Sequence, residues 1–202
     1  EGISTSAERR VQLEKEAADL GAEMGQAAFK LSQSRSQAAR VLTEDVKKEL
    51  ADLEMSQMLF EVAVRQNSTP DGIKGPDGVS YAYNNEGIDN VEFLVSTNPG
   101  EPLKPLARIA STGEISRFTL ALKGALSEAD NIPVMIFDEV DIGVGGRSGD
   151  IIGKKLWTLS RRHQVICVTH LPQIAVYADT HFFVRKNTDN LRTTSTLVNL
   201  AS

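Results

Sequence analysis

A heptad pattern at the start of the chain constrains its fold more than any other feature. Between Ser6 and Gln57 there is no proline, and the only glycines are Gly21 and Gly25. Apolar residues recur at heptad spacing, at Leu13, Ala17, Leu20, Met24, Ala27, Leu31, Ala38 and Val41. After a one-residue shift in phase, which changes winding without ending a helix, they continue at Leu42, Val46, Leu50 and Leu53. This pattern predicts a coiled-coil arm over residues 1–57 that pairs with a helix elsewhere in a longer protein, and a long amphipathic helix on a globular core is the alternative.

The periodicity changes at Met58. The segment "MLFEVAVRQ" alternates apolar and polar residues and predicts a strand over residues 58–66, and "GIDNVEFLVSTN" contains a second strand. Two further segments, "NSTPDGIKGPDGVS" and "PGEPLKP", are rich in proline and glycine. We expect both of them to lack regular structure.

From Ile109 onward, predicted helices alternate with short apolar strands. The helices are expected at about residues 112–128 and 148–161, and the strands at residues 134–137 and 164–169. This alternation predicts an α/β fold with a mainly parallel sheet whose faces are covered by helices. Ligands of such sheets bind at the carboxyl ends of the strands, where the pairs Asp138-Glu139 and Thr169-His170 fall.

The adjacent carboxylates of Asp138 and Glu139 end the apolar run "IPVMIFDE". Neighbouring residues at a strand end can point to different sides of a site. One carboxylate can then hold a magnesium ion and the other can orient an attacking water. A strand that ends in a solvated turn is the simpler alternative.

Three other segments carry candidate site residues. In "IASTGEISR", Ser111 and Glu114 form a capping box, and Gly113 would let a phosphate approach the free N–H groups of the helix start. In "DEVDIGVGGRSG", Asp141 stands in a glycine-rich turn, and in "QVICVTHLPQ", His170 could donate a hydrogen bond to a phosphate. A capped helix, a strand-to-helix connection and a structural histidine are the respective alternatives; His163 and His181 are expected to be structural, and Cys167 to be a buried thiol.

Composition excludes several classes of protein. The formal net charge of −5 argues against a chain that nucleic acid wraps along its whole length. The single cysteine rules out an internal disulfide, and no apolar run is long enough to cross a membrane. The chain begins "EGISTSAERR", without an initiator methionine or a signal region, so we expect it to be part of a longer, cytoplasmic protein.

A phosphate-cradling loop is absent from the sequence. The loop requires the pattern G-x-x-x-x-G-K-[ST]. The only Gly-Lys pair is Gly153-Lys154, which is followed by Lys155, and Ser148 stands where the first glycine is needed. The chain therefore has several parts of an ATP site and lacks the loop that binds the phosphates of ATP.

Together, these segments resemble the C-terminal half of an ABC-type ATPase head. "ASTGE" looks like the signature motif, "VMIFDE" like Walker B, "VDIGVGG" like the D-loop and "VTH" like the switch histidine. The helical arm is similar to that of SMC-type heads, in which a coiled coil separates the Walker A half from this half. The segments "NVEFLVSTNPGEPLKPLARIASTGEISRFTLALK", "IFDEVDIGVGG" and "QVICVTHLPQIAVYAD" look closely similar to a bacterial SMC-like family of DNA repair, and the resemblance covers most of residues 58–202. One departure is Thr112, where that family usually has a second glycine.

The resemblance implies a role for each candidate residue. Asp138 would support Mg²⁺, Glu139 would polarise the attacking water, and His170 would sense the γ-phosphate of ATP. Asp141 would line the seam between two heads. The signature segment would contact ATP held by the other head, through Ser111, Thr112, Gly113 and Glu114.

The resemblance also implies partners: the N-terminal head half of the same parent protein, a second head in a homodimer, and DNA near the nucleoid, with no membrane. We expect residues 1–57 to form the arm and residues 58–202 the C-terminal lobe of the head. This chain alone is expected to have negligible ATP turnover. The alternatives are a non-catalytic scaffold that dimerises through arm and head, and another ABC-type ATPase such as a transporter subunit.

Overall fold

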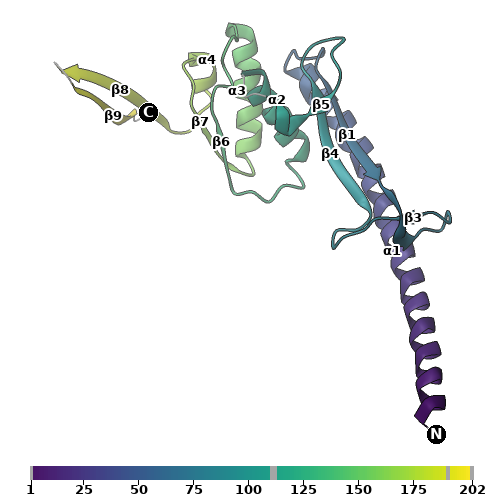
Figure 1. Cartoon of the computed structure of the whole chain (residues 1–202). Helices are drawn as coiled ribbons and strands as arrows, with labels where there is room; N and C mark the ends of the chain where they lie inside the picture. The colour runs from purple at the N-terminus through teal and green to yellow at the C-terminus, as the bar shows by residue number, and fades with distance from the viewer. Residues whose placement is uncertain (1, 110–112, 190–191, 201–202) are drawn as a thin grey trace. The chain divides into compact units, whose positions relative to one another are not determined.

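The computed structural model describes residues 2–109, 113–189 and 192–200, and the chain forms two compact units. The first unit comprises residues 1–45 and 59–107, and the second comprises residues 46–58 and 108–202. Helix α1 (Gly2–Asp52) supplies residues to both units (Figure 1). Among the described residues, no helix has the length and apolar character needed to cross a bilayer.

Helix α1 is continuous over 51 residues, which agrees with the absence of proline. In the first unit its buried face includes Gly25, Ser32 and Ala39. A side chain at residue 25 would overlap the backbone carbonyl of Lys74, so glycine lets that segment approach the helix. The part of the predicted heptad seam in this unit lies on another face and is exposed, at 48% for Leu13, 64% for Leu20, 44% for Met24, 41% for Leu31 and 56% for Val41. Its continuation at Val46, Leu50 and Leu53 belongs to the second unit and is buried. Pairing of this seam with another helix remains a prediction.

The first unit places an antiparallel sheet beside α1. Strand β1 (Leu59–Gln66) pairs along its whole length with β4 (Asp89–Ser96), as the alternating pattern predicts. Phe60 and Phe93 contact each other edge to face, with ring centroids 5.6 Å apart. The backbone N–H of Val62 donates to the hydroxyl of Thr43 on α1 (3.3 Å). The aromatic contact therefore joins β1 to β4, and the hydrogen bond joins the sheet to α1.

Two predictions of irregular structure in this unit are wrong. Within "NSTPDGIKGPDGVS", β2 (Ser68–Lys74) pairs with β3 (Ser80–Tyr81), and the register shifts between Ser68 and Ile73. Within "PGEPLKP", β5 (Lys104–Pro105) pairs with β4, and the short helix η1 (Leu106–Arg108) follows. The prolines are tolerated because β5 lies at the sheet edge and β2–β3 is only a two-stranded ribbon, so a missing N–H breaks no central ladder.

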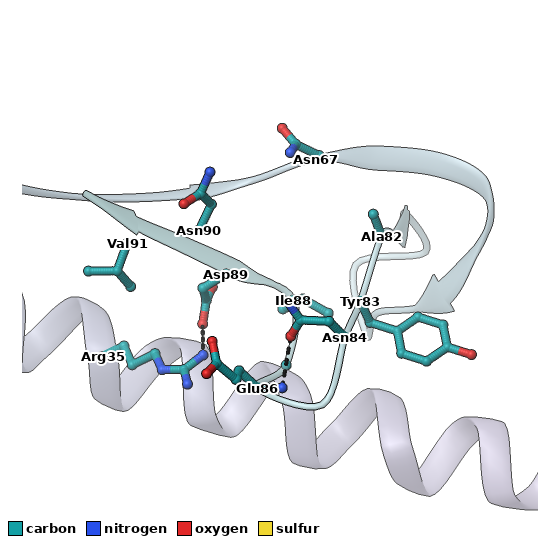
Figure 2. A pocket seen from close by; sticks show the side chains of 11 residues that line it. Arg35, Asn67, Ala82, Tyr83, Asn84, Glu86, Ile88, Asp89, Asn90 and Val91 are labelled. Carbon is teal, nitrogen blue, oxygen red and sulfur yellow. Dashed lines mark hydrogen bonds and ion pairs between the residues drawn. The ribbon is translucent and has the colours of Figure 1, made fainter. Parts of the chain in front are cut away.

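A buried polar network joins α1 to the sheet. The carboxylate of Asp89 accepts hydrogen bonds from Ser32 (2.6 Å) and Gln66 (3.2 Å), and it forms an ion pair with Arg35 (3.1 Å). Figure 2 shows Arg35 reaching up from α1 to Asp89. A cavity of about 700 Å³ opens here, and none of the predicted site residues lines it. We assign this network to the docking of the helix on the sheet.

The second unit alternates helices and strands, as predicted. Helix α2 (Gly113–Leu126), β6 (Val134–Phe137), α3 (Gly146–Ser160), β7 (Gln164–Cys167) and the short α4 (Pro172–Ala175) follow in order. Strands β6 and β7 pair in parallel, with Phe137 opposite Cys167. The core contains the fully buried side chains Phe118, Leu120, Val140 and Ile152, together with Val46 and Leu50 from the last turns of α1.

Only one face of the β6–β7 pair is covered. Met135 and Phe137 are each 5% exposed, whereas their neighbours are open, at 40% for Val134, 69% for Ile136, 46% for Ile166 and 57% for Val168. The prediction that both faces are covered is therefore wrong for this chain. The continuous apolar pattern of the two strands is typical of a sheet that is buried on both sides. The sequence therefore suits a second covering layer over the exposed face, which the described residues do not supply.

A hairpin of β8 (His181–Asp189) and β9 (Arg192–Leu200) ends the described chain, and the sequence analysis made no prediction for it. The two strands pair in unbroken antiparallel register. Apolar residues on both faces of its base are exposed, at 52% for Phe182, 48% for Phe183, 66% for Leu197 and 42% for Val198.

Candidate functional site

The predicted site residues of β6 and β7 meet at the carboxyl edge of the parallel pair. The backbone N–H of Val168 donates to the carbonyl of Phe137 (2.9 Å), which continues the strand pairing by one residue. Asp138 and Glu139 leave this edge from β6, and Thr169 and His170 leave it from β7. The parallel register therefore brings together residues that are about thirty positions apart in the sequence.

Asp138 and Glu139 are both exposed, and a hydrogen bond joins the backbone of Glu139 to the side chain of Asp138. The N–H of Glu139 donates to Oδ1 of Asp138 (2.9 Å), so Oδ2 of Asp138 keeps its lone pairs for another partner. Glu139 has a φ of 60°, in the left-handed region that non-glycine residues seldom adopt. Such backbone strain is concentrated at functional sites.

Asp141 is the best-connected carboxylate of the site. Its side chain is 4% exposed, and its Oδ2 accepts from the hydroxyl of Thr169 (2.5 Å) and from the backbone N–H of His170 (2.8 Å), while Nδ1 of His170 lies 2.9 Å from the same oxygen. Burial alone would raise the pKa of Asp141, but the hydrogen bonds from Thr169 and His170 outweigh burial and lower the pKa. Asp141 therefore stays ionised and ties the turn after β6 to the end of β7.

The start of helix α2 packs against the same turn. A β-carbon at Gly113 would lie 2.9 Å from Cβ of Ile142, 3.0 Å from the carbonyl oxygen of Ile142 and 3.2 Å from that of Glu139. One turn further along α2, Arg117 donates to the carbonyl oxygens of Ile142 (2.9 Å) and Val140 (3.4 Å). Burial lowers the pKa of Arg117, but its charge persists far above neutral pH. Sequence reasoning did not single out Arg117, although it lies in the quoted segment "IASTGEISR".

Part of the predicted signature segment lies outside the described residues. Ser111 and Thr112 are not among the described residues, so the capping box between Ser111 and Glu114 stays a prediction. The described helix begins at Gly113 and carries Glu114 in its first turn, where a carboxylate suits the positive end of the helix dipole.

Of the remaining candidates, His163 agrees with its prediction, Cys167 is less buried than predicted, and His181 is exposed. Cys167 is half-buried, and burial, assisted by the charges of Asp141 and Asp138, raises the pKa of its thiol to about 11. His163 is 6% exposed, and its Nδ1 lies 2.7 Å from the carbonyl oxygen of Ile132, which fits a structural role. His181 is an exposed residue at the start of β8.

The described residues contain no cluster of three or more His, Cys, Asp or Glu side chains that could hold a metal ion. Asp138 therefore offers a single carboxylate. That is enough for Mg²⁺ bound to a nucleotide, because such an ion typically takes one or two carboxylates and completes its shell with phosphates and waters.

Comparison with solved structures defines the class of protein. The fold is similar to the Smc head domain with a coiled coil and joint of Pyrococcus yayanosii (TM-score 0.53, 18% identity), over 83% of this chain and 28% of that one. It is also similar to the Smc head domain with an extended coiled coil of Pyrococcus furiosus (TM-score 0.51, 18% identity), over 83% of this chain and 36% of that one. The chain thus has the α/β fold of the C-terminal lobe of an ABC/SMC-type head with a helical arm, which confirms the predicted fold class.

Sequence comparison narrows the class to a family. No family model matches the chain. The chain is 39% identical over 185 residues to DNA repair protein RecN of Bacillus subtilis, which covers 91% of this chain and 32% of that protein. It is 42% identical over 176 residues to DNA repair protein RecN of Streptomyces coelicolor, which covers 87% of this chain and 31% of that protein. The chain belongs to the RecN family, and it spans about a third of the length of these relatives.

Proposed function

We propose that this chain is the C-terminal lobe of the ATPase head of a protein that repairs and recombines DNA at double-strand breaks. The observation that carries the proposal is the cluster at the carboxyl edge of β6–β7, where Asp141 joins the turn after Asp138-Glu139 to Thr169-His170. The names of the RecN relatives support a role in DNA repair. In this reading residues 1–57 form the arm, residues 58–202 form the lobe, and the parent protein is cytoplasmic and works near the nucleoid.

Each site residue receives a role in ATP hydrolysis. Asp138 would support Mg²⁺ through the oxygen that Glu139 does not occupy. Glu139 would polarise the attacking water, and His170 would contact the γ-phosphate. ATP supplies the phosphate bond whose cleavage separates two heads, and the chain's own residues orient water, metal and phosphate around it.

The signature segment would act on ATP held by a second head of a homodimer. Ser111, Thr112, Gly113 and Glu114 belong to this segment, and Asp141 lies next to it along the turn that Gly113 contacts. A helix start with a glycine at its first residue favours phosphate binding, because the free N–H groups and the helix dipole both attract anions. DNA would be the partner of the assembled protein.

The N-terminal half of the same parent protein is the proposed intramolecular partner. Two observations support it: the sequence contains no phosphate-cradling loop, and one apolar face of β6–β7 is bare at Val134, Ile136, Ile166 and Val168. Burying such side chains contributes about 25 cal/mol per Å² of apolar surface, which favours a second layer over this face.

The test is ATP turnover after the N-terminal half is added back. We expect negligible turnover by this chain alone, turnover by the two halves together, and loss of turnover with Glu139→Gln while ATP-dependent dimerisation persists. Steady hydrolysis by the chain alone that Glu139→Gln abolishes would overturn the need for the N-terminal half. Association of the halves without turnover, in the presence of DNA as well, would favour the scaffold alternative.

A further inference from the structure

Thr169 has been given no role in ATP hydrolysis, yet its hydroxyl contacts the best-connected carboxylate of the site. The hydroxyl donates to Oδ2 of Asp141 (2.5 Å) and accepts from the backbone N–H of Leu171 (3.0 Å). A hydroxyl has a single proton, so the bond from Leu171 leaves that proton to point at Asp141. The hydrogen bond from Thr169 therefore holds the Asp141 carboxylate in one orientation.

His170 depends on that carboxylate for its orientation. The His170 side chain is 70% exposed, and the contact that anchors its ring is the one between Nδ1 and Oδ2 of Asp141 (2.9 Å). An ionised carboxylate has no proton to share, and a bare lone pair on Nδ1 would be repelled at this distance, so the contact favours a proton on Nδ1. The other ring nitrogen, Nε2, is then the atom available to a ligand. A hydrogen bond at one nitrogen is the usual way in which a protein selects the tautomer of a functional histidine.

Asp141 in turn depends on both residues. Its carboxylate is 4% exposed, and Oδ2 accepts hydrogen bonds from the Thr169 hydroxyl and the His170 backbone N–H, with the His170 ring beside it. Removal of the Thr169 hydroxyl would leave the carboxylate with the backbone N–H of His170 and the exposed ring. A buried carboxylate that loses a donor moves toward water or toward another partner, and the ring it holds would move with it.

We propose that Thr169 is a positioning residue: it orients the carboxylate of Asp141, which holds His170 in the Nδ1–H tautomer and leaves Nε2 to meet the nucleotide. This inference rests on the proposed function in one respect only, that the ligand of His170 is the γ-phosphate of ATP. The arrangement of Thr169, Asp141 and His170 is a property of the chain itself and can be measured without ATP.

The first experiment reads the tautomer directly. The full chain with ¹⁵N-labelled histidines is compared as wild type, Thr169→Ser and Thr169→Val by NMR correlation of the ring nitrogens, at about pH 8, where an ordinary imidazole is neutral. Of the 3 histidines, we expect only the signals of His170 to change. The Nδ1–H form should dominate in wild type and Thr169→Ser, and Thr169→Val should shift the ring toward the Nε2–H form that a free imidazole favours.

The second experiment measures turnover in the assembly of this chain with its N-terminal half. We expect Thr169→Val to lower kcat about tenfold, to leave KM for ATP within about twofold, and Thr169→Ser to restore kcat. Thr158→Val is the matched control: the Thr158 hydroxyl donates to the carbonyl of Lys154 on the exposed side of α3, so its loss should leave kcat and the tautomer unchanged. Thr169→Ala removes the same hydroxyl without a second methyl group and replaces Thr169→Val if that variant does not fold.

Two results would overturn the proposal. One is a His170 tautomer that stays Nδ1–H in Thr169→Val. The other is a kcat that falls equally in Thr169→Val and Thr169→Ser, since a merely steric role would do that. Absence of turnover in the wild-type assembly would count against the proposed function instead, and the tautomer measurement would still decide the role of Thr169.

Discussion

At residue 113 any side chain would collide with the turn that follows β6. We expect Gly113→Ala to push Ile142 and the carbonyl of Glu139 away, to cost about 1–3 kcal/mol of unfolding free energy, and to lower turnover of the assembled ATPase about tenfold or more. Thermal unfolding followed by circular dichroism and a steady-state assay would measure the two effects.

Gly21→Ala is the control for that substitution. Gly21 lies within α1, and a β-carbon there meets nothing within 4 Å. Alanine should stabilise the helix by about 0.5–1 kcal/mol, because it removes the conformational freedom that glycine has in the unfolded chain. Equal effects of the two substitutions would show that the turn is not packed against Gly113.

The thiol of Cys167 should react slowly. Burial and the nearby Asp141 and Asp138 raise its pKa from 9.0 to about 11, so at pH 8 its thiolate fraction should be about a hundredfold smaller than that of an ordinary cysteine. Because the folded pKa is raised, the stability that the protonated thiol provides is present below about pH 9 and is lost as the pH rises through about 11. Iodoacetamide labelling followed by mass spectrometry, with the urea-unfolded chain as reference, would measure the reaction rate of the Cys167 thiol. Equal rates in the two states would contradict it.

Sequence reasoning located individual site residues better than it located their contacts. Asp138, Glu139 and His170 were predicted at strand ends because short apolar runs mark those ends clearly. The bonds from Asp141 to Thr169 and His170 span 28 and 29 residues, and they depend on the parallel register of β6 and β7. The contact of Arg117 with Ile142 spans 25 residues and has no local signal in the sequence.

Among the elements, the last turns of α1 and helix α3 are joined by a single lysine. Lys155 lies 2.7 Å from the carboxylates of both Glu49 and Asp52. Burial alone would lower the pKa of Lys155, but the two carboxylates outweigh it and raise the pKa, so the lysine stays charged. The end of α1 is therefore held to the second unit by charge as well as by the buried side chains of Val46 and Leu50.

We expect Lys155→Ala to loosen the end of α1. Amide hydrogen exchange over residues 46–52 should accelerate, and the unfolding free energy should fall by about 1–2 kcal/mol because the partly buried carboxylate of Glu49 and the exposed one of Asp52 lose their partner. Lys154→Ala is the matched control: Lys154 pairs with Asp150 on the exposed side of the same helix and should cost less than about 0.5 kcal/mol. A similar exchange rate in both variants would show that packing alone holds the helix end.

The elements with strong periodicity were predicted closely, and those without it were not. Helix α1 follows a heptad pattern, β1 alternates apolar and polar residues, and β6 is a short continuous apolar run. Strands β2 and β5 were missed because proline and glycine dominate their sequences, and tertiary pairing overrides that local preference at a sheet edge. The open face of β6–β7 could not be predicted, because the pattern of a buried strand says nothing about which chain covers it.

For the molecule as a whole, the bare face of β6–β7 predicts where the proposed N-terminal half of the head would dock. We expect Ile136→Asp to leave the unfolding midpoint of this chain nearly unchanged, because Ile136 is 69% exposed. The same substitution should abolish binding of the N-terminal half, since it would place an unpaired charge in a newly buried layer. Isothermal titration calorimetry with the isolated N-terminal half would measure the loss.

Val79→Asp is the control for this experiment. Val79 is 41% exposed, lies in the other compact unit and should not affect binding measurably. Wild-type affinity of Ile136→Asp would show that the N-terminal half covers another surface. Unfolding of the Ile136→Asp chain would show instead that the exposed face already contributes to its stability.

The left-handed backbone conformation of Glu139 lowers the stability of the protein at a residue that its proposed activity requires. Its φ of 60° suits glycine or asparagine, so a glutamate there costs about 1–3 kcal/mol of stability that the surrounding turn must supply. Most substitutions that destroy a catalytic carboxylate keep that strain, but Glu139→Asn would relieve it while removing the acid. A hydrolysis-deficient protein made in this way should be more thermostable than the active one, which would make it the better form for trapping the ATP-bound assembly.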